Sequence, residues 1–321
     1  MQDDTVVKPS LLPRRVVIGG NTHAELAGAL HAVRRDLEIR ANTLERLTPA
    51  DLEWGDTYLG FRRPPLASMG NIRWVHCTGA GVDSWLYPVE LPKDILLTRS
   101  SESFGPMIAE WALARALAFS QQLLDVAECQ RRHEWAPRDI ADLRRTTAVV
   151  VGTGDVGWHV ARAFKMMGCK TIGVSRSGNG DSAVFDETQR VAALKTVAAI
   201  ADWFIITVPL TAETDGLISR DVLSACKGAV LMNSGRGKVV DARAIPLALN
   251  SGWLRGAALD VFEIEPLPAG SPLWDDRRVM ISPHISGITT SKGAIAGFLE
   301  CIAELERGEL PGRTVDRARQ Y

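Results

Sequence analysis

Three ionisable residues in the second half of the chain have the types and spacing of an acid–base site that binds a carboxylate. Arg236 and His284 each follow an apolar run typical of a buried strand, and Glu265 lies shortly after a third such run. An arginine clamps a carboxylate with two parallel hydrogen bonds, and a histidine gives or takes a proton near neutral pH. Glu265 would accept the second N–H of His284 and orient the ring. Each residue alone also fits an ordinary structural role, but together they predict catalysis on a small acid.

A glycine-rich turn predicts a nucleotide site. The apolar run 148–151 leads into G-x-G-x-x-G at 152–157, and an amphipathic segment follows at 158–167. Strand, turn and helix in this order are the context of the dinucleotide fingerprint. The first glycine allows the tight turn, the second lets a pyrophosphate approach, and the third lets the helix lie close to the sheet. We predict cofactor contacts from Gly152, Gly154, Asp155, Val156 and Gly157.

The end of the next predicted strand indicates which cofactor binds. About 20 residues beyond the glycines, an acidic residue normally bonds the ribose hydroxyls of NAD. This chain has Ser175-Arg176-Ser177 there. Because arginine pairs with phosphate oxygens bidentately, the segment favours the 2′-phosphate of NADP. The alternative is an arginine exposed over the adenine of a protein that uses NAD.

A second small-residue turn lies near the N-terminus. Thr78-Gly79-Ala80-Gly81-Val82-Asp83 follows the apolar segment 74–77. Its backbone N–H groups could form a nest that holds a carboxylate. A plain glycine turn is an equally good interpretation.

The elements that must position these residues alternate strand and helix, which predicts doubly wound parallel sheets with ligands bound beyond the carboxyl ends of the strands. Arg236, Asp260 and His284 should therefore converge on one crevice. The predicted strands are 15–18, 57–59, 74–77, 171–174, 203–208, 229–233, 257–260 and 279–281. Helix starts are predicted at Thr22, in a capping box with Glu25, and at Thr48; longer helices cover 107–131 and 241–250, with an irregular arm at 135–145.

Composition sets the outer bounds. The 321 residues suffice for about two domains, and 46% hydrophobic with 23% charged residues is typical of a soluble globular protein. The net charge of −1 gives no indication of a nucleic-acid or membrane partner. The five scattered cysteines predict reduced thiols in a cytoplasmic protein, with neither a disulfide framework nor a metal site. Because Asp3 and Asp4 stand near the N-terminus and no long apolar stretch follows, we expect no signal peptide, and no run is long enough for a membrane span.

The chain resembles the NAD(P)-dependent D-2-hydroxyacid dehydrogenases over nearly its whole length, and within them most resembles the glyoxylate/hydroxypyruvate reductases. The absence of an acidic residue at Ser175 is the main departure from many members. Glu265 argues against the formate dehydrogenase branch, which has glutamine there. The motifs are 79–83, 152–157, Val208-Pro209-Leu210-Thr211 with Thr214, 233–237, Leu259-Asp260-Val261-Phe262 with 265–267, and Ser282-Pro283-His284.

The resemblance assigns roles to individual residues. It implies that Arg236, Glu265 and His284 are the catalytic trio. It also implies that Ala80 and Gly81 bind the substrate carboxylate, together with Arg236 and His284. Further cofactor contacts would come from Ser175, Arg176, Ser177, Val208, Pro209, Ser234, Gly235, Arg236, Asp260, His284 and Gly287.

The family's layout implies a Rossmann nucleotide-binding domain, residues 103–289, inserted in a smaller flavodoxin-like substrate domain, residues 1–102 and 290–321. The chain would cross near Ser101 and return near Thr289, and a last helix at 292–307 would pack on the N-terminal part. The active site would lie in a cleft that closes on the ligand. Members are commonly homodimers, with the helix that starts at Met107 and the arm after it in the interface.

The expected activity is reduction of a small 2-keto acid, glyoxylate or hydroxypyruvate above all, to a D-2-hydroxy acid, and the reverse, with NADP favoured and NAD possible. The alternatives are an NAD-dependent biosynthetic member such as phosphoglycerate dehydrogenase, and a cofactor-sensing protein like the family's transcriptional corepressors. The sequence does not identify the side-chain pocket. Its candidates, each also a candidate for core packing, are Trp54, Phe61, Trp85, Met107 and Trp274.

Overall fold

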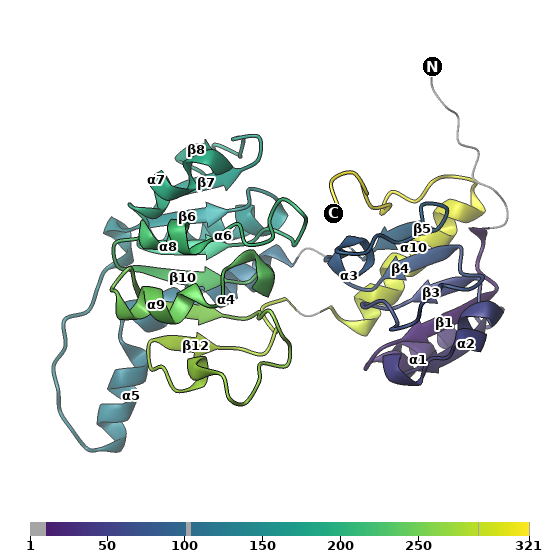
Figure 1. Ribbon diagram of the computed structural model, residues 1–321, viewed down its shortest axis with the longest axis horizontal. Helices are drawn as coiled ribbons and strands as arrows, with labels where there is room; N and C mark the ends of the chain where they lie inside the picture. The colour runs from purple at the N-terminus through teal and green to yellow at the C-terminus, as the bar shows by residue number, and fades with distance from the viewer. Residues whose placement is uncertain (1–10, 101–103, 288, 321) are drawn as a thin grey trace. The chain divides into compact units, whose positions relative to one another are not determined.

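The computed structural model describes residues 11–100, 104–287 and 289–320 (Figure 1). The chain divides into two compact units, one of residues 1–102 and 289–321 and one of residues 103–288. Each unit has one sheet whose paired strands all run parallel. The predicted class, two doubly wound α/β domains with one inserted in the other, is confirmed. The predicted crossing near Ser101 lies outside the described residues.

The first unit is a five-stranded sheet in the order β2-β1-β3-β4-β5. This order is that of the flavodoxin-like fold. Buried strands are apolar on both faces because helices cover each side. The strands are β1 (Arg15–Gly19), β2 (Glu38–Asn42), β3 (Thr57–Leu59), β4 (Trp74–Cys77) and β5 (Leu96–Arg99).

Both faces of this sheet are packed. One core cluster joins β1, β3 and β4 to α1 and α10, with Phe298 of α10 stacked on Trp74 at 4.8 Å between ring centroids. The other joins the opposite faces of the same strands to α2 and α3. The last helix therefore completes a unit that the N-terminal residues begin. The helices are α1 (His23–Val33), α2 (Pro49–Trp54), α3 (Asp83–Leu86) and α10 (Ser291–Glu306), with a 3₁₀ turn η2 (Leu44–Arg46).

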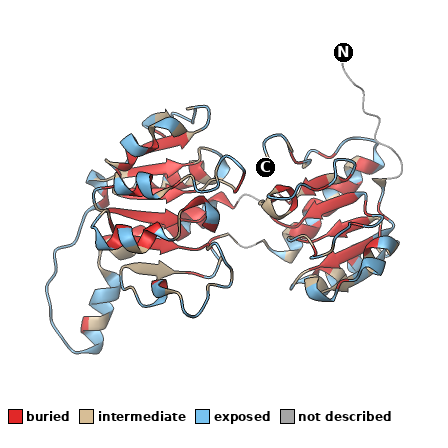
Figure 2. Cartoon of the chain, viewed as in Figure 1, coloured by how far each residue is buried: buried red, intermediate tan, exposed pale blue. Residues whose placement is uncertain are grey.

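The second unit has a seven-stranded sheet in the order β12-β11-β10-β9-β6-β7-β8. Counted from β6, this is the Rossmann order with one further strand at the edge. Its inner strands are buried along nearly their whole length, as Figure 2 shows. The strands are β6 (Thr147–Val151), β7 (Lys170–Ser175), β8 (Glu187–Arg190), β9 (Trp203–Ile206), β10 (Ala229–Asn233), β11 (Leu254–Leu259) and β12 (Val279–Ile281).

The helices of the second unit connect these strands, and α5 projects away from the sheet (Figure 1). They are α4 (Gly105–Ser120), α5 (Leu123–Arg131), α6 (Asp155–Met166), α7 (Leu194–Ala198), α8 (Arg220–Ser224) and α9 (Ala244–Asn250). The 3₁₀ turns are η3 (Leu143–Arg145), η4 (Val191–Ala193), η5 (Gly237–Val239) and η6 (Pro272–Trp274).

Two helix predictions were wrong. The helix predicted over 107–131 is two helices, α4 and α5, because Gln122 between them has a left-handed backbone with φ 50°. The capping box predicted at Thr22 is absent, since its side chain makes no cap bond and its backbone is not extended. The helix start at Thr48 is confirmed, with Pro49 at the first position and Asp51 accepting from the Thr48 N–H and hydroxyl at 3.0 and 2.7 Å.

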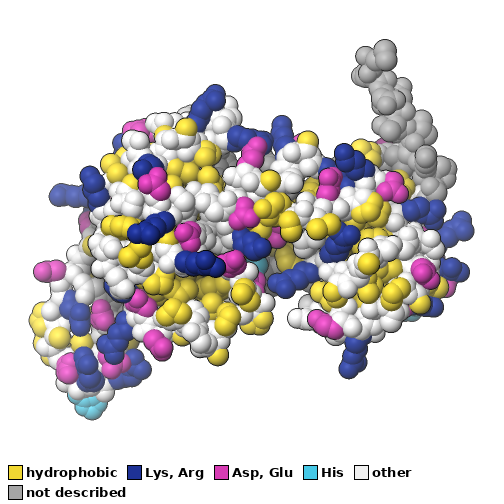
Figure 3. All heavy atoms as spheres, in the orientation of Figure 1, with side chains coloured by type: hydrophobic (Ala, Val, Ile, Leu, Met, Phe, Trp, Pro, Cys, Tyr) yellow, Lys and Arg dark blue, Asp and Glu magenta, His cyan; other side chains and the backbone are white. Residues whose placement is uncertain are grey.

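The visible surface mixes both signs of charge. Figure 3 shows Lys and Arg side chains interspersed with Asp and Glu, which agrees with the net charge of −1. In the part of the chain that the structure describes, no helix combines the length and the apolar character needed to cross a membrane.

Candidate active site

The glycine turn after β6 has the backbone that the fingerprint predicts. Gly152 has φ 108°, and a Cβ there would lie 2.6 Å from Thr207 Oγ1. A Cβ on Gly157 would lie 1.8 Å from the carbonyl oxygen of Gly152, so only glycine lets α6 lie this close. A Cβ on Gly154 would have no neighbour within 4 Å. The open space beside Gly154, at the start of α6, fits the pyrophosphate of a dinucleotide.

The turn that carries Arg236 is built by Asn233, the last residue of β10. The buried Asn233 amide accepts from the Gly235 N–H at 3.1 Å and donates to the Arg236 carbonyl at 3.0 Å. A Cβ on Gly235 would lie 2.5 Å from the Val208 carbonyl oxygen, so the turn passes close to the segment after β9. The Arg236 guanidinium donates to the Gly235 carbonyl at 2.8 Å. Arg236 therefore stands just beyond the carboxyl end of β10, directly after the glycine that approaches Val208.

Asp260, which directly follows β11, organises the loop after β12. It is fully buried, and its carboxylate accepts from the Ser282 hydroxyl at 2.6 Å and from the N–H groups of Ile285 and Ser286 at 3.0 and 2.8 Å. Its carbonyl accepts from the His284 N–H at 2.8 Å. The cofactor contact expected of Asp260 stays a prediction. The structure gives its carboxylate a positioning role for the loop that carries His284.

His284 and Glu265 make the predicted pair. Nδ1 of His284 lies 2.9 Å from Oε2 of Glu265, while Oε1 of Glu265 accepts from the Phe262 N–H at 3.1 Å. His284 has φ 55°, a left-handed backbone that is rare outside glycine and marks strain held by its surroundings. The two side chains keep 32% and 21% of their surface exposed. With Nδ1 turned to the carboxylate, Nε2 is the nitrogen that can exchange a proton with a ligand.

Trp111 of α4 contacts the loop that follows β12 and carries His284. The Trp111 indole N–H donates to the Ser282 hydroxyl at 2.9 Å, and this hydroxyl in turn donates to Asp260. Arg115 lies over the Trp111 ring, 4.8 Å from its centroid. Burial lowers the pKa of Arg115, and the negative charge of Asp260 acts in the opposite direction. Helix α4 thus fixes the hydroxyl that orients the Asp260 carboxylate.

The Ser175-Arg176-Ser177 segment is exposed at the end of β7. Arg176 pairs with Glu213 at 3.4 Å, and the two side chains keep 54% and 69% of their surface. The Ser175 hydroxyl donates to the Asn179 carbonyl at 2.9 Å, whereas the Ser177 hydroxyl accepts from the Asn179 N–H at 3.3 Å. Ser177 and Arg176 therefore keep donors that can serve an anion. Such an exposed ion pair is worth only about 0–1 kcal/mol and exchanges readily.

The turn 78–83 belongs to the first unit. Its carbonyls are bonded inside the chain, the Ala80 oxygen to Arg99 Nη1 at 2.7 Å and the Gly81 oxygen to Cys77 Sγ at 3.4 Å. Within the described residues, the N–H groups of Ala80 and Gly81 have no acceptor. These two neighbouring N–H groups are therefore available to an anion, and carboxylate binding by this turn stays a prediction.

The remaining candidates, Gly287 for the cofactor and five side chains for the substrate pocket, differ in their surroundings. Gly287 packs against α4, since a Cβ there would lie 3.3 Å from Ile108 Cδ1. Trp85 is fully buried in the first unit's core, and Trp54 carries Arg40 on its face at 4.2 Å. Phe61 packs on the turn 78–83, 2.7 Å from where a Cβ of Gly79 would stand, while Met107 and Trp274 are 42% and 49% exposed. Trp85 is therefore a core residue and not part of a pocket.

Sequence reasoning missed the residues that support the site: Asn233, Ser282, Trp111, Arg99 and Glu213. Asn233 and Ser282 stand at strand ends inside motifs that were recognised, and that position was a signal for a turn-shaping role. Trp111, Arg99 and Glu213 act across 171, 19 and 37 residues of sequence. Nothing in the local pattern marks them.

Comparison with known proteins agrees with this fold. The sequence model of the D-isomer specific 2-hydroxyacid dehydrogenase NAD-binding domain matches residues 113–286. A sheet of Rossmann order with a glycine turn after its first strand is the architecture of a dinucleotide-binding domain. The chain belongs to the D-isomer specific 2-hydroxyacid dehydrogenase family, and it is an NAD(P)-dependent oxidoreductase.

Three relatives illustrate the likeness. The chain is 34% identical over 283 residues to glyoxylate/hydroxypyruvate reductase A of Citrobacter koseri, covering 85% of this chain and 90% of that one. The NADPH-dependent glyoxylate/hydroxypyruvate reductase of Sinorhizobium meliloti, solved with NADP and sulfate, superposes with a TM-score of 0.83 at 28% identity over 96% and 100% of the chains. A Xanthobacter autotrophicus family member solved with NADPH and MES gives a TM-score of 0.81 at 29% identity, over 96% and 100%.

Proposed function

We propose that this protein reduces small 2-keto acids, with glyoxylate and hydroxypyruvate as the favoured substrates, to D-2-hydroxy acids, and catalyses the reverse reaction. The observation that carries the proposal is the His284–Glu265 contact of 2.9 Å in a loop that Asp260 holds at the carboxyl edge of the sheet. The names of the relatives from Citrobacter and Sinorhizobium support the substrate class.

Each residue of the trio has a part in the reaction. The Arg236 guanidinium clamps the substrate carboxylate and reaches the keto oxygen, where negative charge develops. His284 delivers a proton from Nε2 to that oxygen, while Glu265 accepts the Nδ1 proton and holds the ring. In the reverse direction, Nε2 takes the hydroxyl proton. The N–H groups of Ala80 and Gly81 bind the carboxylate in the substrate domain.

The nucleotide-binding domain, which we place at residues 103–289, holds the cofactor. The bound nicotinamide dinucleotide supplies the hydride. The glycine turn and the start of α6 would hold its pyrophosphate, because Gly154 leaves that space open. Further contacts with the cofactor, along the carboxyl edge of the sheet, would come from Asp155, Val156, Val208, Pro209, Ser234, Gly235, Asp260 and Gly287.

NADP is the proposed preference, with NAD as the alternative. Support comes from the absence of a carboxylate at Ser175 and from the exposed Arg176, whose partner Glu213 is easily displaced. The Sinorhizobium and Xanthobacter relatives were solved with NADP and NADPH. An NAD-dependent member such as a phosphoglycerate dehydrogenase would need another acceptor for the ribose hydroxyls.

The proposal includes a homodimer in the cytoplasm. Support for the dimer comes from α5 and the segment after it, which expose large apolar side chains unusual for a free surface: Leu123, Leu124, Val126, Ile140 and Trp135, the last 97% exposed. In the described part of the chain the five cysteines form no disulfide with one another, in keeping with a reducing compartment. Sedimentation equilibrium of the protein and of a Leu124→Asp variant tests the dimer, which the variant should dissociate.

The deciding experiment is a turnover assay with glyoxylate, hydroxypyruvate and a panel of larger 2-keto acids, each with NADPH and with NADH. We expect measurable reduction of the two small acids, fastest with NADPH. Absence of turnover with the whole panel, while NADPH still binds, would favour a cofactor-sensing protein like the family's corepressors.

A further inference from the structure

Arg99, the last residue of β5, forms a hydrogen bond with the turn that carries Ala80 and Gly81. Its Nη1 donates to the Ala80 carbonyl at 2.7 Å. The two segments are adjacent because β4 and β5 pair in parallel, with Cys77 opposite Arg99. The arginine backbone is fixed as well, since its N–H donates to the Arg313 carbonyl at 3.2 Å. A part-buried cation on a rigid strand end thus contacts the turn directly.

This contact determines where the Gly81 N–H points. The Ala80 carbonyl and the Gly81 N–H belong to one peptide unit, which is planar and trans, so the two groups point in opposite directions. An arginine that holds the carbonyl on one side therefore holds the N–H on the other. Cys77 holds the next peptide unit, that between Gly81 and Val82, because its thiol donates to the Gly81 carbonyl at 3.4 Å. Gly81 has little resistance of its own to rotation of the unit, because glycine is conformationally permissive.

The same contact strengthens the donor. A cation bonded to a carbonyl oxygen polarises the peptide, and its N–H becomes a better donor to an anion on the far side. The N–H groups of Ala80 and Gly81 have no acceptor within the described part of the chain, so they remain available to a ligand.

We propose that Arg99 is a positioning residue for substrate binding, which acts on the 2-keto acid's carboxylate through the Ala80–Gly81 peptide. The inference rests on the proposed function, in which this turn binds that carboxylate. It predicts that loss of Arg99 weakens substrate binding while cofactor binding and the chemical step change little.

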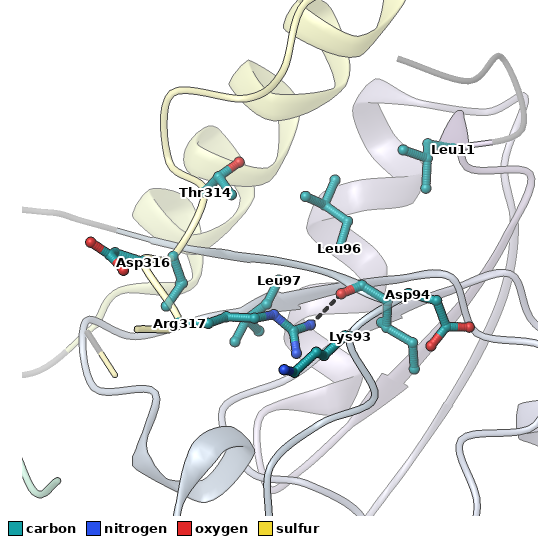
Figure 4. Close-up of a pocket in the computed structure, with 10 residues that line it drawn as sticks. Leu11, Lys93, Asp94, Leu96, Leu97, Thr314, Asp316 and Arg317 are labelled. Carbon is teal, nitrogen blue, oxygen red and sulfur yellow. Dashed lines mark hydrogen bonds between the residues drawn. The ribbon is translucent and has the colours of Figure 1, made fainter. Parts of the chain in front are cut away.

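The test compares Arg99→Met with Arg99→Lys. Arg317→Met is the matched control, because Arg317 also donates to backbone carbonyls of the first unit, those of Leu91 at 2.6 Å, Pro92 at 3.1 Å and Ile95. Figure 4 shows its guanidinium reaching from the C-terminal segment to the loop before β5, beside a surface pocket. The readouts are KM and kcat for glyoxylate, KM for NADPH, the thermal midpoint, and the dissociation constant of oxalate, a non-reacting dicarboxylate, measured calorimetrically with NADP present.

For Arg99→Met we expect KM for glyoxylate and the oxalate dissociation constant to rise about tenfold or more, because the carboxylate then loses the charge-assisted hydrogen bond from a Gly81 N–H that is no longer held toward it. KM for NADPH should stay within about twofold and kcat within about threefold. Arg99→Lys keeps the charge and a donor and should recover part of the loss. Arg317→Met should lower the thermal midpoint without raising either substrate constant.

Three results would overturn the inference: a wild-type glyoxylate KM in Arg99→Met, no recovery in Arg99→Lys, or the same rise in Arg317→Met. If the wild-type protein reduces no 2-keto acid, the proposed function itself is wrong. If it does and Arg99→Met is unimpaired, only the role of Arg99 is wrong.

Discussion

His284 combines a proton-transfer group with a backbone that few residues tolerate. Its φ of 55° means that alanine would change both the chemistry and the loop, whereas asparagine accepts a left-handed backbone. We expect His284→Asn to lose about 10²–10⁴-fold in kcat for glyoxylate reduction, because general acid catalysis is worth that much. NADPH affinity, measured by fluorescence titration, should stay close to that of the wild type.

His133→Asn provides the control for this prediction. His133 is exposed beyond α5 and has nearly the same backbone, with φ 56°, so the substitution makes the same local change away from the site. Near-normal turnover in His284→Asn would remove His284 from the mechanism.

Arg236 tests whether the fork geometry or the charge alone matters. Arg236→Lys keeps the charge but loses the planar guanidinium that can bond the carboxylate and the keto oxygen together. We expect a raised KM and a lowered kcat, since both the bound substrate and the developing oxyanion lose a partner. The control is Arg243→Lys, at an exposed arginine directly before α9, which should behave like wild type. A fully active Arg236→Lys enzyme would contradict the bidentate clamp.

The Arg176–Glu213 pair sets the expected cofactor preference. The wild type should prefer NADPH by about tenfold in kcat/KM, since a charge-assisted bond is worth about 1.5–3 kcal/mol and screening at an exposed rim favours the low end. Arg176→Ala should lose this preference, and Ser175→Asp should shift it to NADH. Glu213→Gln frees the guanidinium and removes a repulsive charge, so it should raise kcat/KM for NADPH about twofold to fivefold at low salt and leave NADH unchanged. A wild-type preference for NADH would show that Arg176 does not meet a phosphate.

At the scale of the element, the turn between β6 and α6 contains two glycines with different roles. Gly157 is needed for packing, and Gly154 faces the proposed ligand. A Cβ on Gly157 would collide with the Gly152 carbonyl at 1.8 Å, so Gly157→Ala should cost about 1–3 kcal/mol or more of unfolding free energy. A Cβ on Gly154 meets nothing within 4 Å, so Gly154→Ala should leave stability unchanged and raise KM for NADPH. Denaturant unfolding and steady-state kinetics on both variants distinguish the two roles. Equal losses of stability would contradict this division.

Most elements predicted correctly from sequence have a uniform environment. Buried strands such as β6, β9 and β10 are continuous apolar runs, and the glycine turn has its own signature. The strands β2, β5 and β8 were missed, and all three lie at sheet edges. In β2 and β8, half-exposed residues such as those of Glu187–Arg190 give no apolar signal. The break at Gln122 was missed because glutamine gives no warning of a left-handed backbone.

The site was predictable in part for a similar reason. Arg236, Glu265 and His284 follow strands whose carboxyl ends must meet at one edge, and the predicted contact between His284 and Glu265 is present. The loop-organising bonds of Asp260 depend on three donors more than twenty residues away and on Trp111 behind them. Spacing along the chain does not encode such a convergence.

At the scale of the whole molecule, the two ends of the chain meet in one unit, and a buried histidine joins them. The Trp74 indole donates to the Thr98 hydroxyl at 2.9 Å, and that hydroxyl lies 2.8 Å from His76 Nδ1. His76 Nε2 lies 3.0 Å from the Ser100 hydroxyl, which donates to the Ala294 carbonyl of α10. Since Ser100 already donates to Ala294, it accepts from Nε2–H, and Nδ1 accepts from Thr98. The network is complete only with a neutral ring.

This network predicts how stability depends on pH. Burial, with the charge of Arg313 acting in the same direction, lowers the pKa of His76 from 6.5 to about 3. Between these values the unfolded chain binds a proton that the folded one does not, so stability is full above pH 6.5 and falls as pH drops. At pH 5 the loss should be about 2 kcal/mol, before most carboxylates titrate. Urea unfolding from pH 7.5 to 4.5 should show this slope, and His76→Gln should flatten it. If that variant does not fold, proton NMR of the wild type decides, because a His76 ring signal that titrates near pH 6.5 in the native protein would contradict the prediction.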